Sequence, residues 1–199
     1  MRTARSEKLN ICVIGTGRAG LIHARNYAGR IPGARLAALV DSHGQSLEAA
    51  CRELEVQKGY RSYPEALQDK QVKAVVVAVP TVLHREIVEA AAQAGKHVLC
   101  EKPMALNVEE CDRMIQASER AGVRLQIGFM RRYDRSFRAA REGIERGDIG
   151  EVVLVKSVTR GPSVPQRWQY DIAASGGTLA EVNSHDIDTV RWFARGEIL

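Results

Sequence analysis

A pair of charged residues, Glu101 and Lys102, directly follows a short apolar segment of the chain. Residues 97–100 read HVLC, and Pro103 comes immediately after the pair. An apolar run with such a boundary is typical of a buried strand. Because open α/β sheets bind ligands at the carboxyl ends of their strands, the pair is a candidate for a binding or catalytic site. A solvated ion pair at the end of a strand is the alternative explanation.

A second candidate site is the sequence GTGRAG, which lies between a predicted strand and a predicted helix. Gly15 allows a tight turn, Gly17 lets a pyrophosphate approach the backbone, and Gly20 lets the helix pack closely on the strand. The free N–H groups at the start of that helix favour a phosphate. The alternative is a glycine turn without a ligand. We expect the following residues to bind a dinucleotide: Gly15, Thr16, Gly17, Arg18, Ala19 and Gly20.

The expected cofactor depends on Asp41, which ends the second predicted strand about 20 residues after the glycine loop. A carboxylate at this place accepts a hydrogen bond from the adenosine ribose 2′-hydroxyl and repels a 2′-phosphate. No Arg or Lys follows within the sequence DSHGQ at 41–45. The sequence therefore favours NAD as the cofactor over NADP.

Short β-branched runs alternate with helical patterns over the first two thirds of the chain, which is typical of βαβ units on a parallel sheet. Most of the strands are apolar on both faces, so we expect an α/β, doubly wound sheet covered by helices on both sides. The predicted strands are 10–15, 34–41, 72–80, 97–101 and 123–129. The predicted helices are 18–29, 45–55, one that ends at Gly95 and one that ends at Gly122.

Three local signals refine this pattern. A short turn element is expected at 63–69. Thr81 is a candidate N-cap for the helix that ends at Gly95, and Asn107 with Glu110 forms a candidate capping pair for the helix that follows. Pro80 and Thr81 follow a strand, so we expect them to line the same crevice as the glycine loop.

The pattern changes after residue 130, where a helix is followed by a long predicted strand at 151–160 and a predicted helix at 178–195. One strand and two helices do not bury a core. We therefore expect residues 1–129 to form an NAD-binding domain and residues 130–199 to be the incomplete beginning of a second domain. This makes the chain a candidate for a C-terminally truncated fragment.

The composition is that of an ordinary globular protein, with 45% hydrophobic and 27% charged residues and a net charge of +5. No apolar run reaches the roughly 20 residues that span a bilayer, and no secretory signal is recognisable, so a cytoplasmic location and no membrane partner are expected. The four cysteines lack metal-ligand spacing and are expected to be reduced thiols, and no metal site is expected. The basic stretch 131–147 is interpreted as a charged helix face, without a nucleic-acid-binding module.

Four motifs together resemble the glucose-fructose oxidoreductase, inositol dehydrogenase and MocA-like oxidoreductases, and most of all the inositol 2-dehydrogenase branch. They are GTGRAGLIHA, AVPTVLHREIVEAAAQAGKHVLCEKPMAL, IGFMRRYD and SGGTLAEVNSHDID. The resemblance implies a Rossmann domain followed by an α+β substrate domain, and a homo-oligomer when the protein is full length. It also implies that Lys102 and His185 act in catalysis, and that these residues lie against the cofactor: Arg18, Pro80, His84 and Glu101.

The predicted helix at 178–195 places Glu181, His185 and Asp188 on one face. A nearby carboxylate orients an imidazole, whose ordinary pKa of about 6.5 suits it to take up a hydroxyl proton. The alternative is a structural histidine. At the position of Glu181, which we count as a candidate catalytic residue, the inositol dehydrogenase branch typically has Asp. Because the side chain here is longer, the expected substrate class is wider than inositol alone.

These features predict an NAD-dependent oxidoreductase that transfers a hydride between the nicotinamide and a secondary hydroxyl of a cyclitol, sugar or sugar derivative. An ammonium at Lys102 would stabilise negative charge on the reacting oxygen. Two alternatives are left open. One is an NAD-using glycoside hydrolase of the same fold, and the other is a non-catalytic dinucleotide-binding module.

Overall fold

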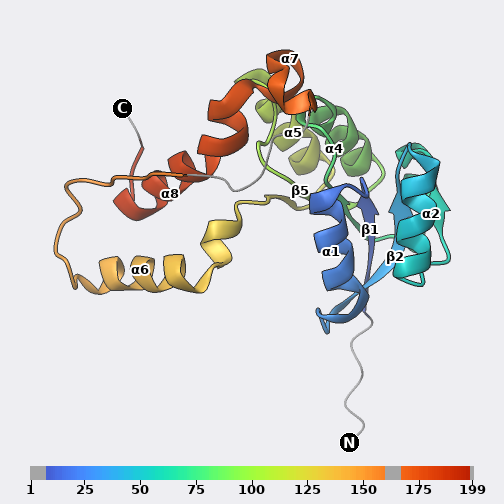
Figure 1. Cartoon of the computed structure of the whole chain (residues 1–199), viewed down its shortest axis with the longest axis horizontal. Coiled ribbons are helices and arrows are strands. Elements are labelled where there is room, and N and C mark those ends of the chain that lie inside the picture. Colours follow the sequence, from blue (N-terminus) through green and yellow to red (C-terminus); the bar gives the residue numbers. More distant parts are fainter. Residues whose placement is uncertain (1–7, 160–166, 198–199) are drawn as a thin grey trace, which may run out of the picture. The chain divides into compact units, whose positions relative to one another are not determined.

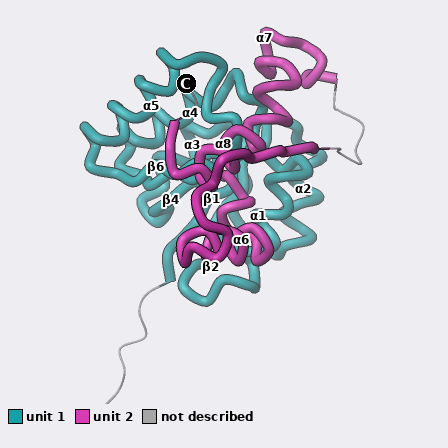
Figure 2. Tube along the Cα trace, turned by 90° about the vertical axis from the view of Figure 1, so that its left-hand side faces the viewer, with its two compact units in different colours: residues 1–127 teal, residues 128–199 magenta. Residues whose placement is uncertain are grey.

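The computed structural model describes residues 8–159 and 167–197 (Figure 1). The chain divides into two compact units, Met1–Ile127 and Gly128–Leu199, which Figure 2 shows in different colours. Each unit is described by itself below.

The first unit is built on a six-stranded sheet in the order β3-β2-β1-β4-β5-β6. All neighbouring strands are parallel. From β1 the chain first builds one half of the sheet and then the other, so the strand order reverses between β1 and β4, where such sheets bind ligands. The strands are β1 (Leu9–Ile14), β2 (Ala34–Val40), β3 (Gly59–Tyr60), β4 (Ala74–Val77), β5 (His97–Cys100) and β6 (Leu125–Ile127).

Helices pack on both faces of this sheet, as the sequence predicts. Helices α1 (Arg18–Gly29) and α2 (Gly44–Glu53) contribute to one core cluster. Helices α3 (Tyr63–Gln68), α4 (His84–Gln93) and α5 (Val108–Arg120) contribute to the other. The doubly wound α/β fold is thereby confirmed.

The side chains of the central strands alternate between these two clusters, because successive residues of a strand point to opposite faces. In β1, Ile11 and Val13 belong to the cluster under α1 and α2, whereas Cys12 and Ile14 belong to the cluster under α3, α4 and α5. Cys12 is fully buried, and burial raises the pKa of its thiol to about 12. It therefore packs as a small hydrophobic side chain, and all four cysteines are free.

Several local predictions are confirmed and two are wrong. Asn107 caps α5 by accepting a hydrogen bond from the backbone N–H of Glu110, and Gly95 follows α4 with φ +69°. The segment predicted as a turn at 63–69 is the helix α3. Thr81 is not an N-cap, because it is the buried first residue of a 3-10 turn (Thr81–Leu83) that precedes α4.

The second unit contains short helical elements. They are the 3-10 turns Met130–Tyr133 and Arg167–Tyr170, the helices α6 (Arg135–Arg146), α7 (Ile172–Ser175) and α8 (Ser184–Ala194), and a π-helical turn Leu179–Asn183. The helix α6 is capped by Asp134, and its exposed face carries the expected pairs four residues apart, such as Arg138 with Glu142.

The strand predicted at 151–160 is not formed over residues 151–159, and residue 160 lies outside the described part. Alternating apolar residues favour a strand, but a strand also needs a neighbour that shares its backbone hydrogen bonds. No strand of the described part of this unit provides that neighbour. The predicted helix at 178–195 also differs at its start, which is the π-helical turn.

Two kinds of feature are absent from the described residues. No helix there is long and apolar enough to cross a membrane. No group of three or more His, Cys, Asp or Glu side chains there is placed to hold a metal ion.

Candidate functional site

The glycine loop between β1 and α1 packs so tightly that two of its glycines cannot carry a side chain. Gly15 has φ +97°, and a Cβ atom added there would lie 2.3 Å from the carbonyl oxygen of Ala78. A Cβ atom on Gly20 would lie 1.8 Å from the carbonyl oxygen of Gly15. A Cβ atom on Gly17, in contrast, would meet no atom within 4 Å. Packing therefore explains Gly15 and Gly20, whereas Gly17 leaves open space above the loop.

The start of α1 offers unused hydrogen-bond donors at the same place. Gly17 is the N-cap residue with extended backbone, and no side chain caps the helix. The first intrahelical bond runs from the N–H of Leu21 to the carbonyl of Gly17, so the N–H groups of Arg18, Ala19 and Gly20 have no carbonyl partner within the helix. The first turn carries no acidic residue. Free N–H groups and the helix dipole together favour an anion such as a pyrophosphate.

Asp41 lies directly after β2 and is tied to the glycine loop. Its Oδ2 atom accepts hydrogen bonds from the backbone N–H of Thr16 at 2.7 Å and from the Thr16 hydroxyl at 2.6 Å. Its Oδ1 atom accepts from the N–H of His43 at 2.8 Å. Burial by itself would raise the pKa of Asp41, but these hydrogen bonds hold it below its ordinary value. The group is therefore a fixed carboxylate beside the loop.

Glu101, one residue after β5, is held by a histidine from α1. The Nε2 atom of His23 lies 2.7 Å from Glu101 Oε1, and the backbone N–H of Lys102 donates to Oε2 at 3.2 Å. Burial would raise the pKa of Glu101, but the contact with His23 and the proximity of Lys102 lower it. Lys102 itself is partly buried, and its peptide bond to Pro103 is cis. The pair is thus an anchored part of the loop after β5, not a freely solvated one.

His84 contacts the backbone of two loops. The ring is almost fully buried, with 1% of the residue exposed. Its Nδ1 atom lies 2.9 Å from the carbonyl oxygen of Pro103, and its Nε2 atom lies 3.0 Å from the carbonyl oxygen of Val79. The ring thus connects the chain after β4 with the chain after β5.

The predicted residues of the first unit therefore come together at the carboxyl edge of four neighbouring strands. The N–H of Gly15 donates to Val40 at the end of β2, the N–H of Ala78 donates to Ile14 at the end of β1, and the N–H of Glu101 donates to Val77 at the end of β4. The partly buried Pro80 and the buried Thr81 follow β4 at the same edge.

The second unit places the predicted His185 and Glu181 at the junction of the π-helical turn and α8. Glu181 is buried and accepts a long hydrogen bond of 3.5 Å from the side chain of Gln169. The His185 ring stands edge-on to Phe129, with ring centroids 6.4 Å apart. π-Helical turns often occur at functional sites.

Two arginines of the segment Met130–Tyr133 each hold an aspartate of α8. Arg131 donates to Asp186 at 2.7 Å, and Arg132 donates three hydrogen bonds to Asp188, at 2.7, 2.9 and 3.2 Å. Burial would raise the pKa of Asp186, but hydrogen bonds from Ser157, Arg131 and Thr159 hold it well below its ordinary value. Asp188, one of the two carboxylates predicted to flank His185, is thus directed to Arg132.

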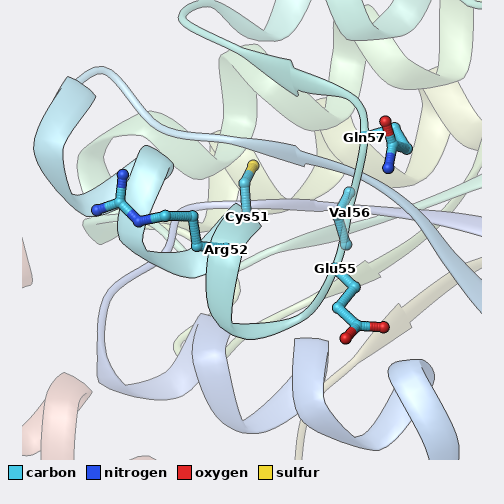
Figure 3. A pocket seen from close by; sticks show the side chains of 5 residues that line it. All are labelled: Cys51, Arg52, Glu55, Val56 and Gln57. Atoms are coloured by element: carbon cyan, nitrogen blue, oxygen red, sulfur yellow. The ribbon is translucent and has the colours of Figure 1, made fainter.

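A shallow hollow lies elsewhere on the first unit (Figure 3). It is lined by Cys51, Arg52, Glu55, Val56 and Gln57, between the end of α2 and the start of β3. Residues that precede a strand of a parallel sheet lie at its amino edge, opposite the glycine loop. This hollow is therefore separate from the site described above.

Two residues at the edge of the site, His23 and Arg61, are not among those predicted from the sequence. His23 follows Gly20 by three positions on α1, a helical spacing that places both on one face and could have indicated it. Arg61 follows the two-residue strand β3 and donates a hydrogen bond of 2.6 Å to the carbonyl of Ser42, next to Asp41. So short a strand gives no periodic signal, so Arg61 could not be placed from the sequence.

Two family matches together cover most of the chain. Residues 9–129 match the oxidoreductase family with the NAD-binding Rossmann fold, and residues 137–199 match the GFO/IDH/MocA C-terminal domain. The chain is 40% identical over 190 residues to the myo-inositol 2-dehydrogenase of Thermotoga maritima, covering 96% of this chain and 56% of that protein. It is 34% identical to the scyllo-inositol 2-dehydrogenase (NAD(+)) of Bacillus subtilis, over 96% of this chain and 55% of that protein.

Among solved structures, the scyllo-inositol dehydrogenase of Lactobacillus casei with bound NAD(H) and scyllo-inositol is similar, with a TM-score of 0.85 and 32% identity. The match covers 95% of this chain and 57% of that one. The chain thus spans just over half the length of the relatives that it matches.

The residues present fit an NAD molecule. The space above Gly17, the free N–H groups that begin α1 and the fixed carboxylate of Asp41 suit a pyrophosphate and an unphosphorylated ribose. Together with the family matches, this geometry means that the chain belongs to the GFO/IDH/MocA family of oxidoreductases, and that its residues 9–129 are the family's NAD-binding Rossmann domain.

Proposed function

We propose that the protein to which this chain belongs is an NAD-dependent dehydrogenase that oxidises a secondary hydroxyl of a cyclitol, a sugar or a sugar derivative. Bound NAD would supply the acceptor for the hydride that leaves the carbon of this hydroxyl. The residues of the chain hold the cofactor, polarise the hydroxyl oxygen and remove its proton. The observation that carries the proposal is the placement of Lys102 at the end of β5, at the edge of the sheet that bears the glycine loop.

Lys102 is assigned the role of binding the reacting oxygen. An ammonium group that donates a hydrogen bond to this oxygen stabilises the negative charge that develops when the proton leaves. The anchoring of the neighbouring Glu101 by His23 supports this role, because it fixes the backbone on which Lys102 stands. A fixed backbone lowers the cost of orienting the ammonium group.

His185 is assigned the role of accepting the hydroxyl proton, with Glu181 as the carboxylate that orients its ring. The burial of Glu181 one turn before His185 supports this assignment. Arg18, Pro80, His84 and Glu101 are proposed to contact or support the cofactor. Relatives named as inositol 2-dehydrogenases support a cyclitol substrate, while Glu181 in place of the usual Asp leaves the substrate class wider.

The proposal is tested by following NADH formation with myo-inositol, scyllo-inositol and common monosaccharides as substrates. We expect Lys102→Ala to abolish turnover while the dissociation constant for NAD changes by less than about threefold, because Lys102 acts on the reacting oxygen. The control is Lys70→Ala, which removes the same charge from an exposed position outside the site. An unchanged kcat in Lys102→Ala would contradict the proposal.

The same assay with an aryl glycoside added distinguishes the alternative reactions. Release of the aglycone from an aryl glycoside without net NADH would identify an NAD-using hydrolase instead. Tight NAD binding without turnover of any substrate, in a protein as long as its relatives, would identify a dinucleotide-binding module.

A further inference from the structure

Arg61 lies beside the loop that carries Asp41. Its Nη2 atom donates to the carbonyl of Ser42 at 2.6 Å. Its Nη1 atom lies 2.5 Å from the position that a Cβ atom of Gly44 would occupy. The guanidinium therefore lies directly against the backbone of the loop between β2 and α2. This loop follows the carboxylate that faces the adenosine ribose in the proposed NAD site.

The two charges at this place differ in how their hydrogen-bonding capacity is used. Asp41 accepts three hydrogen bonds from Thr16 and His43. Arg61 is exposed, and among the described residues no carboxylate forms an ion pair with it. A guanidinium has five N–H donors, and one hydrogen bond to Ser42 leaves the others available to a ligand.

We propose that Arg61 is a second determinant of cofactor choice, a cation placed to bind the 2′-phosphate of NADP, whose effect Asp41 masks in the unmutated protein. This inference rests on the proposed dinucleotide site. No basic residue follows Asp41 within 42–45, but the parallel pairing of β2 with β3 brings Arg61 to Ser42, 19 positions earlier in the chain. Arginine binds phosphates well because its planar group donates two parallel hydrogen bonds.

Gly44 is part of the same arrangement, because any side chain at this position would collide with the guanidinium. Gly44 is the first residue of α2 and its φ is not positive, so alanine fits its backbone. Gly44→Ala would therefore displace the end of the Arg61 side chain without removing its charge. This substitution therefore tests whether the position of the guanidinium matters for NADP binding, and not only its charge.

The experiment measures dissociation constants of NAD and NADP for the full 199-residue chain by titration calorimetry. We expect Asp41→Ser to tighten NADP binding by at least about tenfold, because the repulsion is removed and Arg61 is exposed to the phosphate. Adding Arg61→Gln to Asp41→Ser should reverse most of this gain, and adding Gly44→Ala should reverse part of it. Asp41→Asn, which preserves the side-chain shape, repeats the test in case serine disturbs the loop.

The control is Arg52→Gln in the Asp41→Ser background, because Arg52 is an exposed arginine at the other end of α2. It changes the net charge equally and should leave the gain in NADP affinity intact. Rising salt should weaken NADP binding to Asp41→Ser more steeply than NADP binding to the double variant that also carries Arg61→Gln, because the contact is between charges.

Two results would overturn the inference. One is equal NADP affinity in Asp41→Ser with and without Arg61→Gln. The other is an equal loss of NAD and NADP affinity on Arg61→Gln in the unmutated background, which would place the guanidinium against a part common to both cofactors. Failure of the underlying dinucleotide site would be visible separately, since the unmutated chain would then bind NAD no better than its Gly17→Ala variant.

Discussion

Each of the two units of the chain is stabilised by a different kind of interaction. The first unit buries apolar side chains on both faces of a parallel sheet, including Val75, Val76 and Met114, each at most 1% exposed. In the described part of the second unit, every buried residue is polar: Ser175, Glu181, Asp186, Asp188 and Thr189. Its apolar residues Val153 and Leu154 are instead 90% and 82% exposed.

This difference separates the sources of stability. Burial of apolar area stabilises the first unit, because it removes hydrocarbon from water. The second unit depends on arginine–aspartate pairs such as Arg131 with Asp186, and a buried charge is tolerated only while its partner is present. The same type of substitution should therefore act differently in the two units.

The largest expected effect tests the apolar core. Met114→Ala should lower the free energy of unfolding of the first unit by about 2–5 kcal/mol, because the side chain is fully buried on α5. Leu154→Ala in the second unit should change the free energy of unfolding of that unit by less than about 0.5 kcal/mol. Urea unfolding followed by circular dichroism measures both, and equal losses would remove the distinction between the units.

The second prediction concerns the charged pairs. Arg131→Met leaves the buried Asp186 without its guanidinium and should destabilise α8 locally by about 2 kcal/mol. Hydrogen exchange should show faster exchange of α8 amides while β1 and β4 are unchanged. Arg138→Met, which breaks an exposed pair with Glu142, is the control and should have little effect. Faster exchange throughout the first unit would contradict a local role.

A third prediction separates binding from packing within the first unit. Gly17→Ala should weaken NAD binding at least about tenfold, or about 1.4 kcal/mol, because the methyl group occupies the space above the loop. The free energy of unfolding should be unchanged, since no protein atom lies within 4 Å of the added carbon. Gly29→Ala, at the other end of α1 and equally free of contacts, should leave NAD affinity intact. Equal effects of the two substitutions would place the ligand elsewhere.

The smallest expected effect is a pH dependence at the end of β5. The pKa of Glu101 is lowered in the folded protein, from an ordinary value of 4.5. Its contribution to stability is therefore present above that value and is lost as the pH falls through the lower, folded pKa. His23→Ala should make this loss shallower, and Glu101→Gln should remove it. Urea midpoints measured from neutral pH to about pH 3 would show this, and a steeper loss in His23→Ala would refute it.

Features encoded by neighbouring residues could be predicted from the sequence. The glycine loop and the cap at Asn107 each depend on a short segment, and the structure contains the expected local geometry for both. The contact of His23 with Glu101, 78 positions later, could not be predicted in this way. It depends on which strand ends meet at one edge of the sheet, and no local pattern contains that information.

The strand expected at 151–160 shows that a local pattern can also predict an element that does not form. Its apolar residues alternate only in part, and Val153, Leu154 and Val158 are all exposed. Alternation specifies which face of a strand is apolar, but a partner must supply the hydrogen bonds that make the segment a strand. The π-helical turn before α8 could likewise not be predicted from the sequence, because its residues are compatible with an ordinary helix.

The buried ring of His84 has a mechanical consequence for the site. One nitrogen lies against the carbonyl of Val79 and the other against the carbonyl of Pro103, so a shift of either loop disturbs a contact of the same rigid ring. The loop after β4 and the loop that carries Lys102 are therefore connected through this ring. A molecule that orders the first loop has already restricted the second, and whatever binds next to Lys102 loses less conformational entropy.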